Sequence, residues 1–167
     1  MSDDAIHVKA RRVLDACRTH GLKLVIAESC TAGLVAGALT EIPGASDVVE
    51  RGFVTYSNES KSEMLGVPAA MIAEHGAVSE PVARAMAEGA LARAASRAGV
   101  SIAVTGVAGP GSDSRTKPAG LVHFAAARVG KGALHEKREF GDIGRHAVRR
   151  AAVEAALDLI LRRLGEG

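Results

Sequence analysis

Short apolar segments alternate with longer amphipathic segments along this chain, and this alternation constrains the fold more than any other feature. Two apolar runs, Leu22–Ala27 and Val100–Thr105, each follow a glycine and have the length of buried strands. Amphipathic stretches such as Ile6–Cys17 instead place their apolar residues at helical spacing. Alternating helices and buried strands predict a three-layer α/β/α sandwich with a partly parallel sheet.

The remaining elements follow from the same signals of spacing, caps and turns. Ser29–Thr31 is expected to turn directly into a helix that reaches Thr40. Further helices are predicted at Asn58–Leu65, Ser79–Ala98 and His146–Leu164, and strands at Val48–Tyr56, Gly120–Val129 and Ala133–Phe140. The last two strands form a hairpin, which makes the sheet mixed, and a long loop is expected over Gly106–Ala119.

Composition limits the class of protein. The 167 residues predict a single domain over positions 1–167, and 47% apolar with 24% charged residues is typical of a globular protein. A net charge of +2 and the scarcity of aromatic side chains argue against nucleic-acid binding, because base stacking requires aromatic rings.

Location and metal content are also constrained. No apolar run approaches the roughly 20 residues of a membrane span, so a membrane partner is not expected. The acidic start Met1-Ser2-Asp3-Asp4 lacks the apolar run of a signal peptide. Two cysteines, Cys17 and Cys30, suit a reducing compartment and cannot form a four-ligand zinc site. A cytoplasmic protein without a metal is therefore expected.

The segment Glu28-Ser29-Cys30-Thr31-Ala32-Gly33 stands where the first strand ends and a helix is expected to begin. Ligands of open α/β sheets bind outside the carboxyl ends of strands, and free N–H groups at a helix start attract anions. A serine here would therefore meet an environment that stabilises an oxyanion. The alternative is that Ser29 or Thr31 is only a helix N-cap, which is the commoner role at such positions.

A serine hydroxyl needs a base before it can act as a nucleophile. None of the six histidines stands near a partner motif, and a Gly-x-Ser-x-Gly segment is absent. Lys61 follows the second strand, and a desolvated lysine can accept a proton, as in Ser-Lys hydrolases. Tyr56, the only tyrosine, could orient this lysine. Taken singly, a solvated lysine and a half-buried strand tyrosine are the simpler interpretations.

Two further segments could bind an anionic ligand. Val104–Gly111 carries a buried strand into a glycine-rich turn, whose N–H groups can approach phosphate or carboxylate. The turn matches neither a nucleotide-triphosphate loop nor the dinucleotide fingerprint. Arg145 and Arg149 are four residues apart on one helical face, where two guanidinium groups could hold a phosphate. A plain surface loop and a solvated arginine pair are the alternatives.

In combination, these segments resemble the C-terminal domain family of the competence/damage-inducible protein CinA, whose stand-alone members are nicotinamide-nucleotide amidohydrolases. The resemblance extends from about Leu14 to Leu164. The residues that carry it are Ala27–Gly33, Gly52–Asn58 with Lys61, Gly76–Glu80, Thr105–Gly111, Lys117–Gly120, and Arg145 with Arg149. Several ordered motifs that agree at once are far more specific than any one of them.

The resemblance implies hydrolysis of the carboxamide of nicotinamide mononucleotide to nicotinic acid mononucleotide and ammonia, without a cofactor. It implies that Ser29 is the nucleophile, that Lys61 and Tyr56 assist it, and that Thr105 belongs to the same site. Lys61 is expected to deprotonate Ser29, while amides near Cys30 and Thr31 hold the oxyanion. The residues assigned to substrate binding are Cys30, Thr31, Gly33, Asn58, Gly106, Gly109 and Arg145.

Two other interpretations stay open at this point. The same cleft could belong to a non-catalytic module that senses a nucleotide or binds a partner protein. Alternatively, Cys30 could be the nucleophile, because a helix start lowers the pKa of a thiol. The expected partner is a small pyridine nucleotide, and self-association into a dimer or higher homo-oligomer is left open.

Overall fold

The chain folds into six helices and five strands over the residues that the computed structural model describes, which are 3–94, 96–113 and 116–165. The first half holds α1 (Asp3–Thr19), β1 (Leu24–Glu28), α2 (Leu34–Thr40), a short 3-10 turn (Ala45–Asp47), β2 (Val49–Val54), α3 (Asn58–Leu65) and α4 (Ala69–His75). The second half holds α5 (Glu80–Arg93), β3 (Val100–Gly106), β4 (Leu121–Arg128), β5 (Gly132–Glu139) and α6 (Arg145–Leu164).

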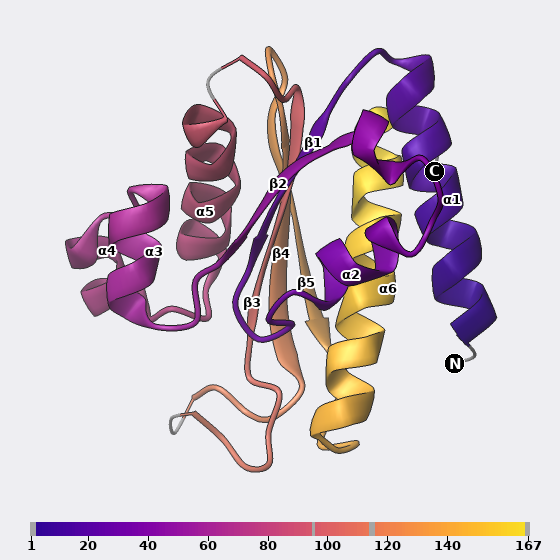
Figure 1. The fold of residues 1–167 in the computed structure, drawn as a ribbon. Helices are drawn as coiled ribbons and strands as arrows, with labels where there is room; N and C mark the ends of the chain where they lie inside the picture. The colour runs from indigo at the N-terminus through magenta and orange to yellow at the C-terminus, as the bar shows by residue number, and fades with distance from the viewer. Residues whose placement is uncertain (1–2, 95, 114–115, 166–167) are drawn as a thin grey trace.

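The strands form one mixed sheet in the order β2-β1-β3-β4-β5. β1 pairs in parallel with β2 and β3, whereas β4 runs antiparallel to both β3 and β5. Helices α1, α2 and α6 cover one face of this sheet, and α3, α4 and α5 cover the other (Figure 1). The predicted three-layer α/β/α sandwich with a mixed, partly parallel sheet is confirmed.

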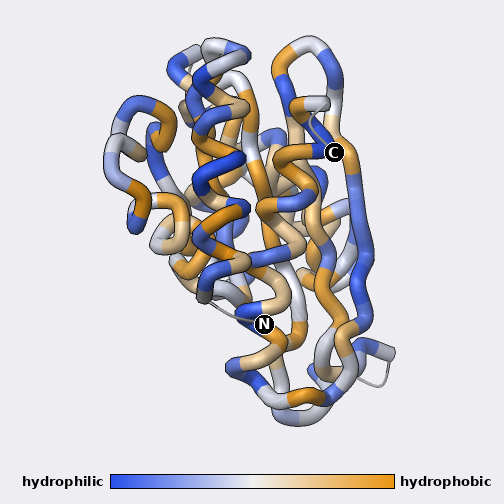
Figure 2. Tube along the Cα trace, turned by 90° about the vertical axis from the view of Figure 1, so that its right-hand side faces the viewer, coloured by the Kyte–Doolittle hydropathy of each residue, from blue (hydrophilic) through white to orange (hydrophobic). Residues whose placement is uncertain are grey.

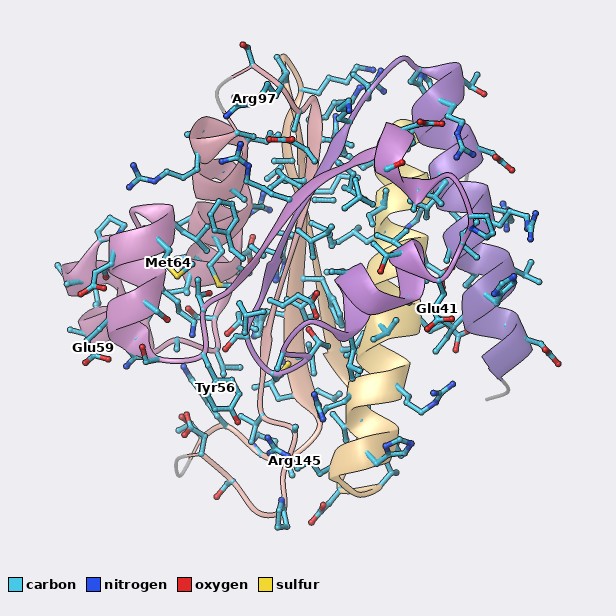
Figure 3. All side chains as sticks on the ribbon, in the orientation of Figure 1. Glu41, Tyr56, Glu59, Met64, Arg97 and Arg145 are labelled. Carbon is cyan, nitrogen blue, oxygen red and sulfur yellow. The ribbon has the colours of Figure 1, made fainter. Side chains whose placement is uncertain are left out.

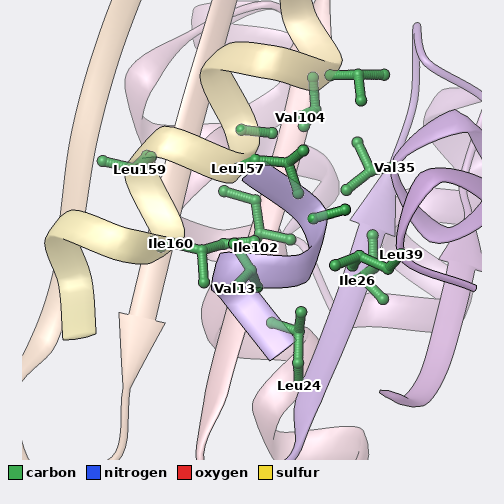
Figure 4. Close-up of a cluster of buried hydrophobic side chains, with 14 of the residues drawn as sticks. Val13, Leu24, Ile26, Val35, Leu39, Ile102, Val104, Leu157, Leu159 and Ile160 are labelled. Carbon is green, nitrogen blue, oxygen red and sulfur yellow. The ribbon is translucent and has the colours of Figure 1, made fainter. Parts of the chain in front are cut away.

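Two apolar clusters hold the layers together. Alternate residues of β1 point to opposite faces of the sheet, so Leu24 and Ile26 join the cluster under α6 while Val25 and Ala27 join the cluster under α5. Figure 4 shows the larger cluster, in which residues of β1 and β3 pack against α1, α2 and α6. Apolar and polar residues alternate along the helices that face the viewer in Figure 2, as amphipathic helices require.

The predicted elements differ most from the structure at three places, which are two helix boundaries and one helix that was not predicted. Helix α2 begins at Leu34 rather than directly after Ser29, for a reason that belongs to the site described below. Helix α5 ends at Arg93 rather than near Ala98, and Ser96 has a left-handed φ of 66°, which an α-helix does not accommodate. Helix α4 was not predicted, because it is short and lacks a capping side chain.

Gly89 allows α5 to pack closely against the end of α3. A Cβ atom at this position would overlap the backbone carbonyl of Leu65. We expect Gly89→Ala to lower the free energy of unfolding by about 2–4 kcal/mol, because backbone cannot move aside as a flexible side chain can. Urea unfolding followed by circular dichroism measures this change.

Gly37 provides the matched control. It lies on an exposed part of α2, and nothing stands within 4 Å of a Cβ atom built there. Gly37→Ala should raise the free energy of unfolding by about 0.5–1 kcal/mol, because alanine restricts the unfolded chain. Equal effects of the two substitutions would contradict the close packing of α3 on α5.

Candidate active site

A cavity of about 500 Å³ opens at the carboxyl ends of β1 and β3. These strand ends lie at the lower end of the sheet in Figure 1, beside the long loop that follows β3, and residues of this loop line the cavity. Most residues predicted for the site line it, namely Ser29, Cys30, Tyr56, Asn58, Lys61, Thr105, Gly106, Gly109 and Arg145. Thr31 and Gly33 do not, since Thr31 is fully buried and Gly33 faces a second cavity.

Glu28, the last residue of β1, determines where α2 begins. Its carboxylate is buried and accepts hydrogen bonds from the amides of Gly33 (3.0 Å), Val35 (3.0 Å) and Ala36 (2.9 Å). A buried carboxylate at a helix N-terminus is stabilised by these donors and by the helix dipole.

The predicted use of this helix start is therefore wrong in two respects. Neither Ser29 nor Thr31 is the N-cap; Gly33 holds that position with a left-handed φ of 96°. The first amides of α2 already bind Glu28, so they are not free for a ligand. Residues 29–33 instead form a separate turn between strand and helix, and this segment, the Ser29 turn, carries Ser29 into the cavity.

Lys61 and Ser29 meet in the cavity although 32 positions separate them. Because β2 runs parallel to β1, the segments after both strands leave the same edge of the sheet. Ser57 caps α3 by accepting a hydrogen bond from the Ser60 amide at 3.1 Å, and Lys61 follows within the first turns of this helix. The Lys61 Nζ then lies 3.0 Å from the Ser29 Oγ.

Two carbonyl groups fix the orientation of the Lys61 amine. The Nζ atom donates to the carbonyl oxygens of Thr55 at 2.8 Å and Ser57 at 3.4 Å. An ammonium at this position donates to the Ser29 Oγ as well, whereas a neutral amine has only two N–H bonds, and when both go to the carbonyl groups its lone pair faces the Ser29 hydroxyl. Burial lowers the pKa of Lys61 below its ordinary value of 10.5, and the negative charge of Glu59 offsets this only in part.

Cys30 is unsuited to be the nucleophile. Its side chain is 5% exposed, and burial raises the pKa of the thiol to about 12. The prediction that a helix start lowers this pKa is wrong, because α2 begins four residues later and its first amides bind Glu28. A neutral thiol is a poor nucleophile.

Tyr56 and Arg145 form one wall of the cavity, where Figure 3 shows them side by side. The Arg145 guanidinium donates to the Tyr56 hydroxyl at 2.9 Å and to the Gly109 carbonyl at 2.9 Å. The hydrogen bond found for the Tyr56 hydroxyl is thus to Arg145, whereas backbone carbonyls orient Lys61. Thr105 donates to the carbonyl of Ala77 at 2.9 Å and so ties β3 to the segment before α5.

Arg145 and Arg149 do not form the joint clamp that their spacing suggests. Only Arg145 lines the cavity that contains Ser29. Arg149 lines a second cavity, of about 730 Å³, between α1, α2 and α6. Its guanidinium donates to the carbonyl oxygens of Cys30 at 3.0 Å and Thr31 at 3.1 Å.

Sequence reasoning missed three contributors to the site. Glu28 was quoted in the motif without a role, although a carboxylate at the end of a strand before a helix is a capping signal. The segment Gly76–Val78 lines the cavity because the unpredicted α4 directs it there. The carbonyl groups that orient Lys61 belong to the backbone, so side-chain chemistry in the sequence did not reveal them.

The described part of the chain holds neither a membrane-spanning helix nor a cluster of metal ligands. None of its helices is both long enough and apolar enough to cross a membrane. Within the same residues, no group of three or more histidine, cysteine, aspartate or glutamate side chains is arranged to hold a metal ion.

Comparison with known proteins establishes the family. The family model of the CinA C-terminal domain matches residues 7–164. The crystal structure of a competence/damage-inducible protein from Agrobacterium tumefaciens has a TM-score of 0.91 and 49% identity, over 99% of this chain and 97% of that one. This chain therefore belongs to the CinA C-terminal domain family.

The curated relatives differ in length. Nicotinamide-nucleotide amidohydrolase PncC of Escherichia coli K12 is 45% identical over 161 residues, which are 96% of this chain and 95% of that protein. A CinA-like protein of Gloeobacter violaceus is 48% identical over 86% of this chain, but over only 33% of its own length. The chain thus spans about a third of the length of several relatives and nearly all of the Escherichia coli protein.

Proposed function

We propose that this protein hydrolyses the carboxamide of nicotinamide mononucleotide to nicotinic acid mononucleotide and ammonia. The observation that carries the proposal is the 3.0 Å contact between the Lys61 Nζ and the Ser29 Oγ in a cavity. The volume of about 500 Å³ suits a small-molecule ligand. The name and the similarity of the Escherichia coli amidohydrolase support the same reaction.

The acylation step uses the Ser29–Lys61 pair. Neutral Lys61 accepts the hydroxyl proton while the Ser29 Oγ attacks the carboxamide carbon, and the carboxamide oxygen becomes an oxyanion. The amide of Cys30, which lines the cavity, donates to this oxyanion, whereas the buried Thr31 does not reach it. Lys61 then returns its proton to the carboxamide nitrogen, the C–N bond breaks, and ammonia leaves an acyl-enzyme on Ser29.

The second half of the reaction reverses these proton transfers. Lys61 removes a proton from a water molecule, which attacks the acyl carbon. The ester bond to the Ser29 Oγ breaks, Ser29 recovers its proton from Lys61, and nicotinic acid mononucleotide is released. This mechanism uses neither a metal nor a cofactor.

Arg145 and the glycine-rich loop are proposed to hold the phosphate of the substrate. Arg145 is exposed at the rim of the cavity, and its position is determined by bonds to Tyr56 and Gly109. A guanidinium group binds phosphate with two parallel hydrogen bonds. Asn58, Gly106 and Gly109 line the same cavity and are proposed to contact the rest of the nucleotide.

The direct test incubates the purified protein with nicotinamide mononucleotide. We expect ammonia, detected with glutamate dehydrogenase, in equal amount to nicotinic acid mononucleotide separated by chromatography. A non-catalytic nucleotide sensor would show binding in a calorimeter and no ammonia. Nicotinamide riboside, which lacks the phosphate, should react with a higher KM if the proposed phosphate contacts exist.

The pH dependence of kcat/KM tests the role of Lys61. Because only the neutral amine accepts a proton, activity should rise with pH, with a midpoint below the ordinary lysine value of 10.5. The stability of the fold depends on pH in the same direction. Between the lowered pKa and 10.5 the unfolded chain keeps the Lys61 proton that the folded chain has lost, so the free energy of unfolding rises with pH. A rate that falls as pH rises over this window would contradict the assignment.

A further inference from the structure

Arg149 lies outside the cavity that contains Ser29, yet it contacts the Ser29 turn directly. Its Nε donates to the Cys30 carbonyl at 3.0 Å, and its second terminal nitrogen donates to the Thr31 carbonyl at 3.1 Å. We propose that Arg149 is a positioning residue that holds the turn so that the Cys30 amide faces the oxyanion and the Cys30 carbonyl does not. This inference deepens the proposed function and rests on it.

The carbonyl oxygens of Ser29, Cys30 and Thr31 are all engaged. The Ser29 carbonyl accepts from the Ala32 amide at 3.1 Å, and the Thr31 carbonyl also accepts from the Leu34 amide at 3.1 Å. Arg149 binds the Cys30 carbonyl, which has no other donor in the described chain. These three residues therefore present no spare carbonyl that would repel a developing negative charge.

Only some of the amide groups of the turn have an acceptor within the protein. The Ser29 amide donates to the Val104 carbonyl at 2.9 Å, and the Gly33 amide binds the Glu28 carboxylate. Within residues 3–94, 96–113 and 116–165, no backbone carbonyl accepts from the amides of Cys30 or Thr31. Of these two residues only Cys30 lines the cavity, so its amide is the donor beside the serine that can reach an oxyanion.

Peptide geometry shows how Arg149 keeps the Cys30 carbonyl away from the cavity that contains Ser29. In a trans peptide, the carbonyl and the following N–H point in opposite directions. When Arg149 holds the Cys30 carbonyl on the side of the second cavity, the Thr31 N–H points away from that side. Ser29 and Cys30 line the first cavity, whereas Arg149 lines only the second, so the guanidinium and the substrate lie on different sides of the turn.

The turn needs such support because its backbone is strained. Ala32 has a φ of 47°, in the left-handed region that residues with a Cβ atom rarely adopt. Glu28 holds the far end of the turn through Gly33, and Arg149 holds the middle. Without Arg149, the peptide after Cys30 can rotate and place its carbonyl where the oxyanion forms.

The test compares Arg149→Met with Arg149→Lys and with the matched control Arg150→Met, which removes the neighbouring charge on α6. Three quantities are measured: kcat and KM with nicotinamide mononucleotide, the dissociation constant of nicotinic acid mononucleotide, and the rate at which a fluorophosphonate modifies Ser29. The phosphonate adduct places a charged oxygen at the oxyanion position and does not depend on the identity of the substrate. Circular dichroism checks that each variant is folded.

Arg149→Met should lower kcat and the modification rate of Ser29 by about 10²-fold, the usual cost of losing one oxyanion donor. KM and the dissociation constant should change by less than about threefold, because ground-state binding does not use this donor. Arg149→Lys should recover part of the loss, since an ammonium keeps the charge but cannot match the planar fork. Arg150→Met should behave as wild type.

A raised KM with unchanged kcat would overturn the inference, because it would make Arg149 a ligand contact. An unchanged modification rate in folded Arg149→Met, or a wild-type Ser29 that does not react with the probe, would overturn it as well. If Arg149→Met fails to fold, the modification rate of Ser29 is measured in Arg149→Ala with added guanidinium ion. A restored rate supports the inference, and a rate that the ion does not restore overturns it. Arg149-dependent modification without ammonia release would instead refute only the proposed substrate.

Discussion

Ser29→Ala is expected to abolish ammonia release from nicotinamide mononucleotide, with a loss in kcat of at least about 10³-fold. The substitution removes the oxygen atom that attacks the carboxamide carbon, and a methyl group cannot replace it. Ser29 is 8% exposed and its hydroxyl lies beside Lys61 at the cavity, so removal of this one atom leaves the surrounding fold in place. Coupled ammonia detection under substrate saturation measures the change, and binding of nicotinic acid mononucleotide should persist.

Cys30→Ala is the companion variant that separates the two candidate nucleophiles. The Cys30 backbone amide, which the mechanism uses, is still present in alanine. Because the pKa of the thiol is raised to about 12, the lost group is neutral at physiological pH. We expect the variant to keep kcat within about tenfold of wild type. A dead Cys30→Ala beside an active Ser29→Ala would reverse the assignment.

Lys61→Met should be the second most damaging substitution, with a loss in kcat of about 10³-fold. Methionine matches the volume of the buried lysine stem but cannot accept the Ser29 proton. The remaining activity should also lose its rise with pH, because the titrating amine is gone. A pH series of kcat/KM for this variant measures both effects.

Two controls test whether that loss is specific to Lys61 and depends on Ser29. Lys131→Met removes an exposed lysine from the turn between β4 and β5 and should leave the pH profile unchanged. The double variant Ser29→Ala/Lys61→Met should lose no more activity than the worse single variant, since the two groups act as one unit. A loss that is the product of the two single losses would show that they act independently.

Local patterns in the sequence were sufficient to predict the α/β/α architecture. Strands β1 and β3 follow from short apolar runs, and α3 follows from the Ser57 cap and the spacing after it. Helix α4 was not predicted, because its seven residues have no capping side chain and the helix is stabilised by burial of Ile72 against the core. Short helices depend on tertiary contacts more than on propensity.

The start of α2 shows a different limit. A serine after a strand is usually a cap, and this alternative for Ser29 was wrong because Gly33 holds the N-cap position. The carboxylate of Glu28 takes the amides of α2 instead, which frees the serine hydroxyl for Lys61. Whether a polar side chain caps or reacts depends on which neighbour satisfies the backbone first.

The sequence by itself determined the order of helices and strands and the chemical types at the ends of the strands: a serine, a lysine and a glycine-rich turn. These properties follow from local backbone preferences and from the period of apolar residues. Only the tertiary structure decided that Lys61 reaches Ser29, that Arg145 and Arg149 face different cavities, and that burial lowers the pKa of Lys61. The reason is physical: contact and desolvation arise between segments that are distant in the chain, and packing of the whole domain is what brings them together.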